Sequence, residues 1–137
     1  MATDISTDVF NGLPAENGIF STVQGKDFAA RRAVFNAVTN SKRLRDMISK
    51  PVKVSNIVVQ MVEYVSETTG ESQRRPRTIL LTPEGEAYAT TSVAVLRTVQ
   101  NIISLLGMPH EWPEPLTFVP EMVRGSKGFE FIQLTLA

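Results

Sequence analysis

Apolar and polar residues alternate through the second half of the chain in runs typical of β-strands. Residues 52–65 are rich in β-branched side chains, and the apolar positions change from even to odd numbers near Asn56. A one-residue change of phase is what a β-bulge produces, and bulges allow a strand to bend. We therefore expect one long strand here that curves around a core.

The rest of this half predicts a hairpin, a helix and two more strands. Thr82-Pro83-Glu84-Gly85 is a turn signal between strand-like residues 77–82 and 86–91. Residues 93–106 carry apolar side chains at helical spacing, with Ser92 as the N-cap and Gly107 at the C-terminal end. Strand-like residues 116–123 and 129–136 then flank a glycine turn. The order is β-β-β-α-β-β.

This order predicts a mainly β fold, a five-stranded OB-like barrel with one helix between strands 3 and 4. Such barrels present an open face where bases stack on side chains and basic residues follow the phosphates of a single strand. We therefore expect single-stranded nucleic acid as the partner.

The N-terminal part is polar and interrupted by glycine and proline, and we divide the chain into an arm, residues 1–27, and a domain, residues 28–137. The arm is expected to be extended or disordered unless it docks, and could support self-association through apolar anchors. These anchors are Val9, Phe10, Ile19 and Phe20. Residues 28–48 suit a helix that is interrupted at Asn40-Ser41, after which Ser41 could cap a short second helix. One rough face of the first part carries Phe28, Val34, Phe35 and Val38.

Composition excludes several classes of protein. With no cysteine and one histidine, His110, the chain offers no disulfide and no ordinary zinc site, and we expect no cofactor. The sequence contains no Gly-rich phosphate loop and no Ser/His/Asp set, so we expect no enzymatic activity. No run approaches the roughly 20 apolar residues of a membrane helix, and the first ten residues lack a signal-peptide pattern, so we expect a soluble, intracellular protein.

The formal net charge is zero, but the charges are unevenly distributed. Residues 24–53 contain eight basic and two acidic side chains, and three more arginines occur at 74, 75 and 77. A basic stripe on a neutral chain argues against coating of duplex DNA by bulk charge and favours a local anionic partner.

Several segments, in their order and spacing over residues 33–137, resemble the single-stranded DNA-binding proteins of small bacteriophages with protein-primed genome replication. The segments are Phe35-Asn36-Ala37, VKVSNIVVQ (52–60), ETTGE (67–71), Pro76-Arg77-Thr78, AYATTS (87–92) and EPLTFVPEMVRGSKGFEFIQLTL (114–136). The resemblance implies a non-catalytic protein with an OB-like core that coats displaced strands during phage replication. It also implies contacts with phage replication proteins and a location in the cytoplasm of the infected bacterial host. The alternative is an OB-like module that binds another protein in a viral complex.

The candidate binding residues are two tyrosines for stacking and six basic residues for phosphates. They are Tyr64, Tyr88, Lys53, Arg74, Arg75, Arg77, Arg124 and Lys127. The arginines at 74–77 are expected at the mouth of the second strand. Each tyrosine could instead be a half-buried sheet residue, and each cation a solvated surface group. We expect Phe118, Phe129 and Phe131 in the core and Trp112 in a packing role. The Arg31/Arg32 and Lys42/Arg43/Arg45 groups are expected on the wet face of a helix, with binding to the strand as the alternative.

Overall fold

The computed structural model describes residues 18–137, apart from the side chain of Tyr64. This part of the chain forms two α-helices and eight strands in two sheets, so the prediction of a mainly β fold is confirmed. The strands are β1 (Ile19–Ser21), β2 (Lys42–Arg43), β3 (Val52–Val54), β4 (Asn56–Val65), β5 (Ser72–Leu81), β6 (Ala87–Thr90), β7 (Leu116–Arg124) and β8 (Glu130–Leu136). The helices are α2 (Phe28–Asn40) and α3 (Val93–Leu106), with 3-10 turns η1 (Leu44–Met47) and η2 (Pro109–Glu111).

Strands β3 and β4 are the two halves of the predicted long strand, and the bend falls at Ser55. The Ser55 amide donates to the Leu81 carbonyl at 2.8 Å, while Asn56 is the register partner of the same Leu81. Two residues therefore oppose one, as in a β-bulge. Because the phase changes here, Val54 and Ile57 both enter the main core, and the predicted bulge is confirmed.

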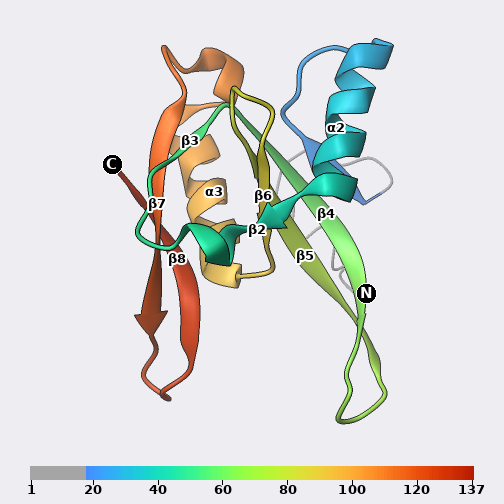
Figure 1. The fold of residues 1–137 in the computed structure, drawn as a ribbon, viewed down its shortest axis with the longest axis vertical. Helices are drawn as coiled ribbons and strands as arrows, with labels where there is room; N and C mark the ends of the chain where they lie inside the picture. Colours follow the sequence, from blue (N-terminus) through green and yellow to red (C-terminus); the bar gives the residue numbers. More distant parts are fainter. Residues whose placement is uncertain (1–17) are drawn as a thin grey trace.

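The two sheets do not close into a barrel. One sheet has the order β1-β4-β5-β6-β2 and the other β3-β7-β8. The order of the main strands, and the helix between the third and fourth of them, are as predicted, but β6 and β8 do not pair. Instead β2 occupies the second edge of β6 in parallel, with Lys42 opposite Tyr88 and Arg43 opposite Ala89. A gap is left between β6 and β8, so a closed barrel is not confirmed (Figure 1).

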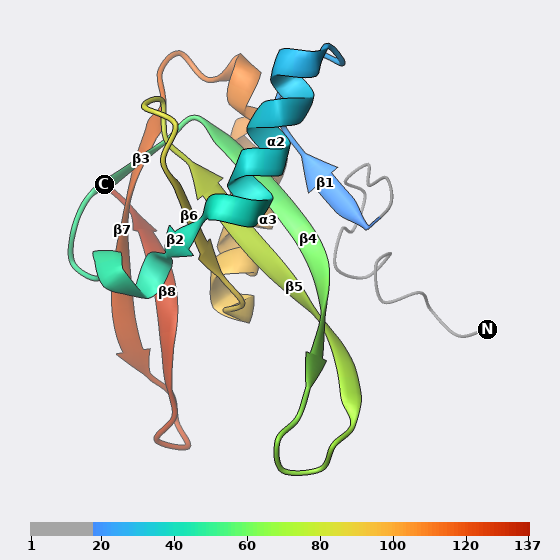
Figure 2. The same ribbon diagram turned by 45° about the vertical axis from the view of Figure 1, so that its right-hand side comes forward.

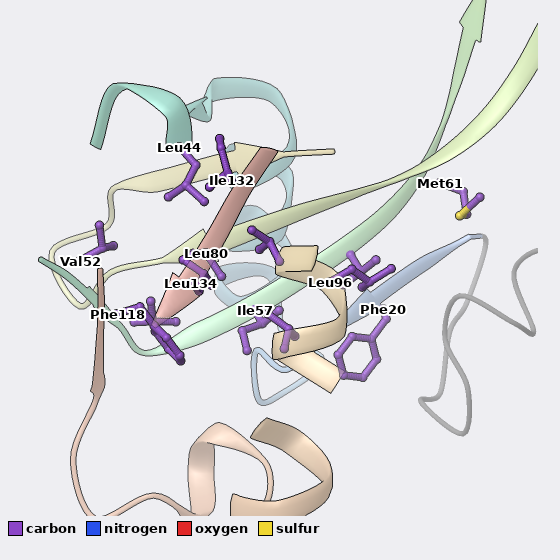
Figure 3. Packing of buried hydrophobic residues seen from close by; sticks show 14 residues of the cluster. Phe20, Leu44, Val52, Ile57, Met61, Leu80, Leu96, Phe118, Ile132 and Leu134 are labelled. Carbon is purple, nitrogen blue, oxygen red and sulfur yellow. The ribbon is translucent and has the colours of Figure 1, made fainter. Parts of the chain in front are cut away.

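Helix α3 fills the space between the sheets with its large apolar side chains. Val95, Leu96 and Val99 are buried in the main core, where side chains from both sheets meet them (Figure 3). The predicted ends of the helix are correct. The Ser92 hydroxyl accepts a hydrogen bond from the Val95 amide at 3.4 Å, and the left-handed Gly107 (φ 87°) follows the last turn.

Helix α2 lies on the opposite face of the first sheet, across β4, β5 and β6 (Figure 2). It buries only alanines, and Ala37 packs on Val58, Ile79 and Ala87 in a second, smaller core. The predicted interruption at Asn40 is confirmed. The predicted second helix with a Ser41 cap is wrong, because β2 follows instead.

The predicted packing face of α2 is right for its valines and wrong for its phenylalanines. Val34 and Val38 pack against the second core, whereas Phe28 and Phe35 are 75% and 64% exposed. The alanines and valines of this helix, not its aromatic residues, fit close against the sheet.

The described part of the segment assigned to the arm is docked on the domain. Strand β1 pairs with β4, and Phe20 is fully buried in the main core. The Thr22 hydroxyl accepts from the Ile57 amide at 2.8 Å and donates to the Asn56 side chain at 3.0 Å. The proposed anchors Val9 and Phe10 lie outside the described residues. Within residues 18–137, no helix has the length and apolar character needed to cross a membrane.

Candidate nucleic-acid interface

Two hairpins extend from the same end of the molecule. The β4–β5 hairpin turns at residues 66–71 and the β7–β8 hairpin at residues 125–129, and Figures 1 and 2 both show the two tips below the body, pointing the same way and separated from each other. The tips are the turns that join the first two and the last two main strands, which are the loops that flank the binding groove in OB-type proteins. Any groove between them would be accessible to a long polymer.

A cleft of about 470 Å³ lies where β6 and β8 fail to pair. The end of β6 and the start of α3 form one wall, and β8 forms another. The Ser92 hydroxyl donates to the Ile132 carbonyl at 2.6 Å and so holds the two walls together. The lining residues are Arg43, Arg45, Arg77, Ala89, Thr90, Thr91, Ser92, Glu130, Phe131 and Ile132. The cleft is thus formed by four separate segments of the chain.

Three arginines meet in this cleft with one carboxylate. Arg43 comes from β2, Arg45 from η1 and Arg77 from β5, while Glu130 is paired with Arg124 at 3.8 Å. The ion pair of Arg43 with Asp46, at 3.2 Å, is exposed on both sides. Such surface pairs contribute only about 0–1 kcal/mol, so Arg43 can exchange Asp46 for a phosphate at small cost.

Arg77 is held in place by the protein. Its guanidinium donates to the Val38 carbonyl at 2.9 Å, to the Gln60 side chain at 3.5 Å and to the Ser41 hydroxyl. It therefore satisfies the C-terminal end of α2, where carbonyl groups lack helical partners and a cation is favourable. Arg77 joins α2 to the sheet as well as lining the cleft.

An ion pair between Lys42 and Glu86 links β2 to the turn before β6. Lys42 Nζ lies 2.6 Å from the Glu86 carboxylate. The hydrogen bond and negative charge of Glu86 raise the pKa of Lys42. Desolvation opposes this increase in pKa, and the charge of Tyr88 adds to it. This pair links β2 to the hairpin that precedes β6, and the parallel pairing of Arg43 with Ala89 places Arg43 beside the cleft.

Phe131 supplies an aromatic surface in the cleft. It is 37% exposed, because Ile132 and Leu134 are the residues of β8 that face the core. Phe129, at the hairpin tip, is 76% exposed. The prediction that both belong to the core is wrong, whereas Phe118, fully buried, and Trp112, partly buried against the core, are as predicted. An exposed ring beside arginines is the combination that stacks bases and holds phosphates.

The arginines at 74–77 lie within a strand. Strand β5 begins at Ser72, five residues before the predicted start, and pairs with β4 to its end. Side chains alternate along it, so Arg75 shares the face of Arg77, whereas Arg74 points toward β1, near Gly18. Of these three, only Arg77 lines the cleft. The expectation that these arginines lie together at the mouth of the strand is therefore wrong.

The structure disperses the other predicted residues. Lys53 is exposed on β3 opposite Thr117, seven residues along β7 from Arg124, which is about 23 Å at ~3.3 Å per residue. Arg124 and Lys127 are exposed at the tip of the β7–β8 hairpin. These contacts stay predictions.

The structure describes the side chain of Tyr88 but not that of Tyr64. Tyr88 is half-buried on β6 and packs against the main core, as in the alternative reading of a sheet residue. Tyr64 is on β4 opposite Gln73, and its side chain lies outside what is described. Their role in stacking also stays a prediction.

The cleft residues that were not among the main candidates are Arg43, Arg45 and Phe131. One signal for Phe131 was present. In residues 129–136 the face of Ile132, Leu134 and Leu136 has more aliphatic residues than the face of Phe129 and Phe131. For Arg43 and Arg45 the basic stripe was the signal, but their place beside the cleft was not visible, because β2 pairs in parallel with a strand more than 40 residues later.

The described residues contain no group of three or more side chains suited to a metal ion. A cleft with three arginines, one paired glutamate and a phenylalanine offers electrostatic attraction and stacking. Such a lining suits an anionic polymer with aromatic groups.

Comparison with known proteins agrees with this chemistry. A family model described as phage single-stranded DNA-binding protein matches residues 14–137. No curated protein and no solved structure gives a significant match. The matched region begins before the segments in which the resemblance is visible by residue, and it includes β1, α2 and β2. With a match over nearly its whole length, the chain belongs to the phage single-stranded DNA-binding protein family.

Proposed function

We propose that this protein coats single strands exposed during phage genome replication, and that the strand lies in the cleft between the two hairpins. Family membership gives the role in binding single-stranded DNA. The observation that carries the proposed site is the meeting of Arg43, Arg45 and Arg77 beside the exposed Phe131 in the gap between β6 and β8. In this proposal the unpaired sheets act as an open, OB-like groove.

Each part of the cleft has a separate task in this proposal. Arg43 and Arg45 bind phosphates, and Phe131 stacks a base. Arg77 is already bonded within the protein and acts by holding α2, β2 and their arginines in position. The hairpin tips, with Arg124 and Lys127, guide the strand where it enters or leaves.

A salt titration of binding to oligo-dT tests the site. Binding that releases counterions weakens linearly in log affinity against log salt, with a slope of about 0.7 per phosphate contact on a single strand. The Arg43→Ala/Arg45→Ala variant should therefore lower the slope by about 1.4. Arg97→Ala, an exposed arginine of α3 outside the cleft, is the matched control and should leave the slope within error of the parent.

Phe131→Ala separates stacking from charge. Loss of one stacked base costs about 1–3 kcal/mol, or roughly 5- to 150-fold in affinity, without a change in salt slope. Phe131→Tyr should retain most of the affinity because it keeps the ring. If the arginine variant and the phenylalanine variant both bind like the parent, the strand lies elsewhere on the molecule.

Coating also requires indifference to sequence. Stacking accepts any base, so dT, dC and mixed strands of equal length should compete within about tenfold, and duplex should bind more weakly. A preference of a hundredfold for one short sequence would contradict coating. Salt-insensitive docking to a protein, with no affinity for oligo-dT, would favour the alternative of an interaction module.

The proposed role places the protein in the cytoplasm of the infected host, with the phage replication proteins as partners. Self-association through the N-terminal segment is part of the same proposal. Because Phe20 is a core residue, a truncation that tests it should remove residues 1–17 and keep β1. Loss of cooperative filling of long strands at unchanged melting temperature is the expected result.

A further inference from the structure

Helix α2 presents its largest apolar residues to solvent. Phe28 and Phe35 are 75% and 64% exposed, while Ala30 and Ala37 are buried beneath them. Burying a phenylalanine side chain is ordinarily favourable, and contiguous exposed apolar groups on a soluble domain mark a site of interaction. The arrangement is the reverse of that expected for a helix whose only task is to cover a sheet.

The same face carries arginines between the two rings. Phe28, Arg31, Arg32 and Phe35 fall at helical spacing, and with Asn36 they line a hollow of about 620 Å³. The Arg32 guanidinium lies over the Phe28 ring, 5.6 Å from its centroid. Within residues 18–137 no carboxylate forms an ion pair with Arg31 or Arg32. Rings and guanidinium planes together are surfaces on which unpaired bases stack.

This face leads directly to the cleft. The C-terminal end of α2 is bonded to Arg77, through the Val38 carbonyl and the Ser41 hydroxyl, and Arg77 lines the cleft. At 1.5 Å per residue, Phe35 lies about 4.5 Å and Phe28 about 15 Å along the helix from Val38. From residue 28 to residue 45 the sequence has five basic residues and no acidic one.

We propose that the Phe28/Arg31/Arg32/Phe35 face of α2 is a second contact surface for single-stranded DNA, which continues the path of the strand beyond the cleft. The inference rests on the proposed function. Charge decides the class of occupant, because arginines between exposed rings suit a polyanion with aromatic groups better than an aliphatic helix or a second neutral copy of the chain. A strand that leaves the cleft past Arg43 would meet Phe35 first and Phe28 last.

Strand length distinguishes the two surfaces. Oligo-dT from about 4 to about 30 nucleotides spans the range from part of one groove to well beyond the ~4–16 nucleotides that an OB-type fold covers. The Phe28→Ala/Phe35→Ala variant should bind the shortest strands like the parent and the long strands tenfold or more weakly. Arg31→Ala/Arg32→Ala should lower the salt slope by about 1.4 on long strands only.

The controls are residues of similar type on α3. Leu105→Ala removes an apolar side chain that is 82% exposed, and Arg97→Ala removes an exposed arginine. Neither should change affinity at any length. A direct measurement uses the fluorescence of a Phe35→Trp variant, corrected for the signal of Trp112 in the parent. Long strands should quench the added fluorescence, and short strands should not.

Four results would overturn the inference. Parent-like affinity of both α2 variants at every length would leave the cleft as the DNA site and remove α2 from it. Equal loss of affinity at all strand lengths in the α2 variants, with the cleft variants binding like the parent, would make α2 the primary site. That result would also contradict the proposed position of the strand in the cleft. Binding of poly-L-glutamate by the parent but not by Phe28→Ala/Phe35→Ala, with DNA binding unchanged, would assign the face to an acidic protein. A melting temperature lowered by several degrees in that variant would show that the two rings are packing residues of the folded protein and not a free surface.

Discussion

Helices α2 and α3 are similar in length, 13 and 14 residues, and lie on opposite faces of one sheet, yet they bury opposite kinds of residue. Helix α3 places Val95, Leu96 and Val99 in the main core. Helix α2 places alanines against the sheet and leaves Phe28 and Phe35 in solvent. One helix places large side chains in the main core, and the other packs on the sheet through small side chains and presents its large ones as a surface. Variants that exchange or remove these properties test the comparison.

The largest effect is expected in the buried face of α3. Leu96→Ala should lower the free energy of unfolding by about 2–5 kcal/mol, because it removes a nearly buried side chain and leaves a cavity. Leu105→Ala, the same change at an exposed position of the same helix, should stay within about 0.5 kcal/mol. Urea unfolding measures both. Equal effects at the two positions would contradict the assignment of α3 as the core helix.

The next effect is expected where α2 is fastened. Arg77→Ala leaves the Val38 carbonyl and the Ser41 hydroxyl without their donor, and should cost about 1–3 kcal/mol of stability. Amide exchange should increase at the C-terminal end of α2 and not in α3. Arg75→Ala, two residues earlier on the same face of β5, is the comparison variant. Stability equal to that of the parent would show that α2 is held by its alanine contacts alone.

A smaller effect is expected at the start of α3. The Ser92 hydroxyl both caps the helix and donates to the Ile132 carbonyl, so Ser92→Ala should cost about 1–2 kcal/mol. Ser92→Thr keeps the hydroxyl and should restore most of this. Thr98→Ala removes only a bond to the Ala94 carbonyl within the helix and should have little effect. Failure of threonine to restore stability would point to packing as the cause.

The smallest effect is expected at the exposed ion pair between Lys42 of β2 and Glu86 in the turn before β6. Glu86→Gln should lower the pKa of Lys42 toward its ordinary value, since Glu86 is the main cause of the increase. A raised lysine pKa stabilises the fold below the unfolded value of about 10.4, and this contribution is lost as pH rises through the folded value. The parent should therefore melt slightly higher than the variant at pH 8, with the difference vanishing at strongly alkaline pH. NMR titration of the Lys42 side chain measures the pKa shift, and an unchanged pKa would contradict it.

Local signals predicted the elements that depend on neighbouring residues. Ser92 and Gly107 bound α3, the turn before Glu86 joins β5 to β6, and the phase change near Asn56 marks the bulge at Ser55. Each of these depends on a cap, a turn or an alternation within a few residues. Such features are visible in sequence because their energies are local.

The missing features depend on pairing between distant segments. Nothing around Lys42 and Arg43 indicates that they pair in parallel with Tyr88 and Ala89. That pairing prevents β6 from meeting β8, and so creates the cleft. Phe35 was assigned to a packing face because large apolar residues are usually buried, whereas close approach of α2 to the sheet requires Ala37.

The short strands β1 and β2 have a consequence for solubility. They are the two edges of the first sheet, three and two residues long, and between them lie β4 and β5 with ten residues each. A long unpaired strand is a template for pairing with another molecule, and very short edge strands reduce this risk. In the proposed coating role the protein must reach high local concentration without aggregating. Variants that detach β1, which contributes no residue to the cleft, should therefore precipitate before they lose their affinity for DNA.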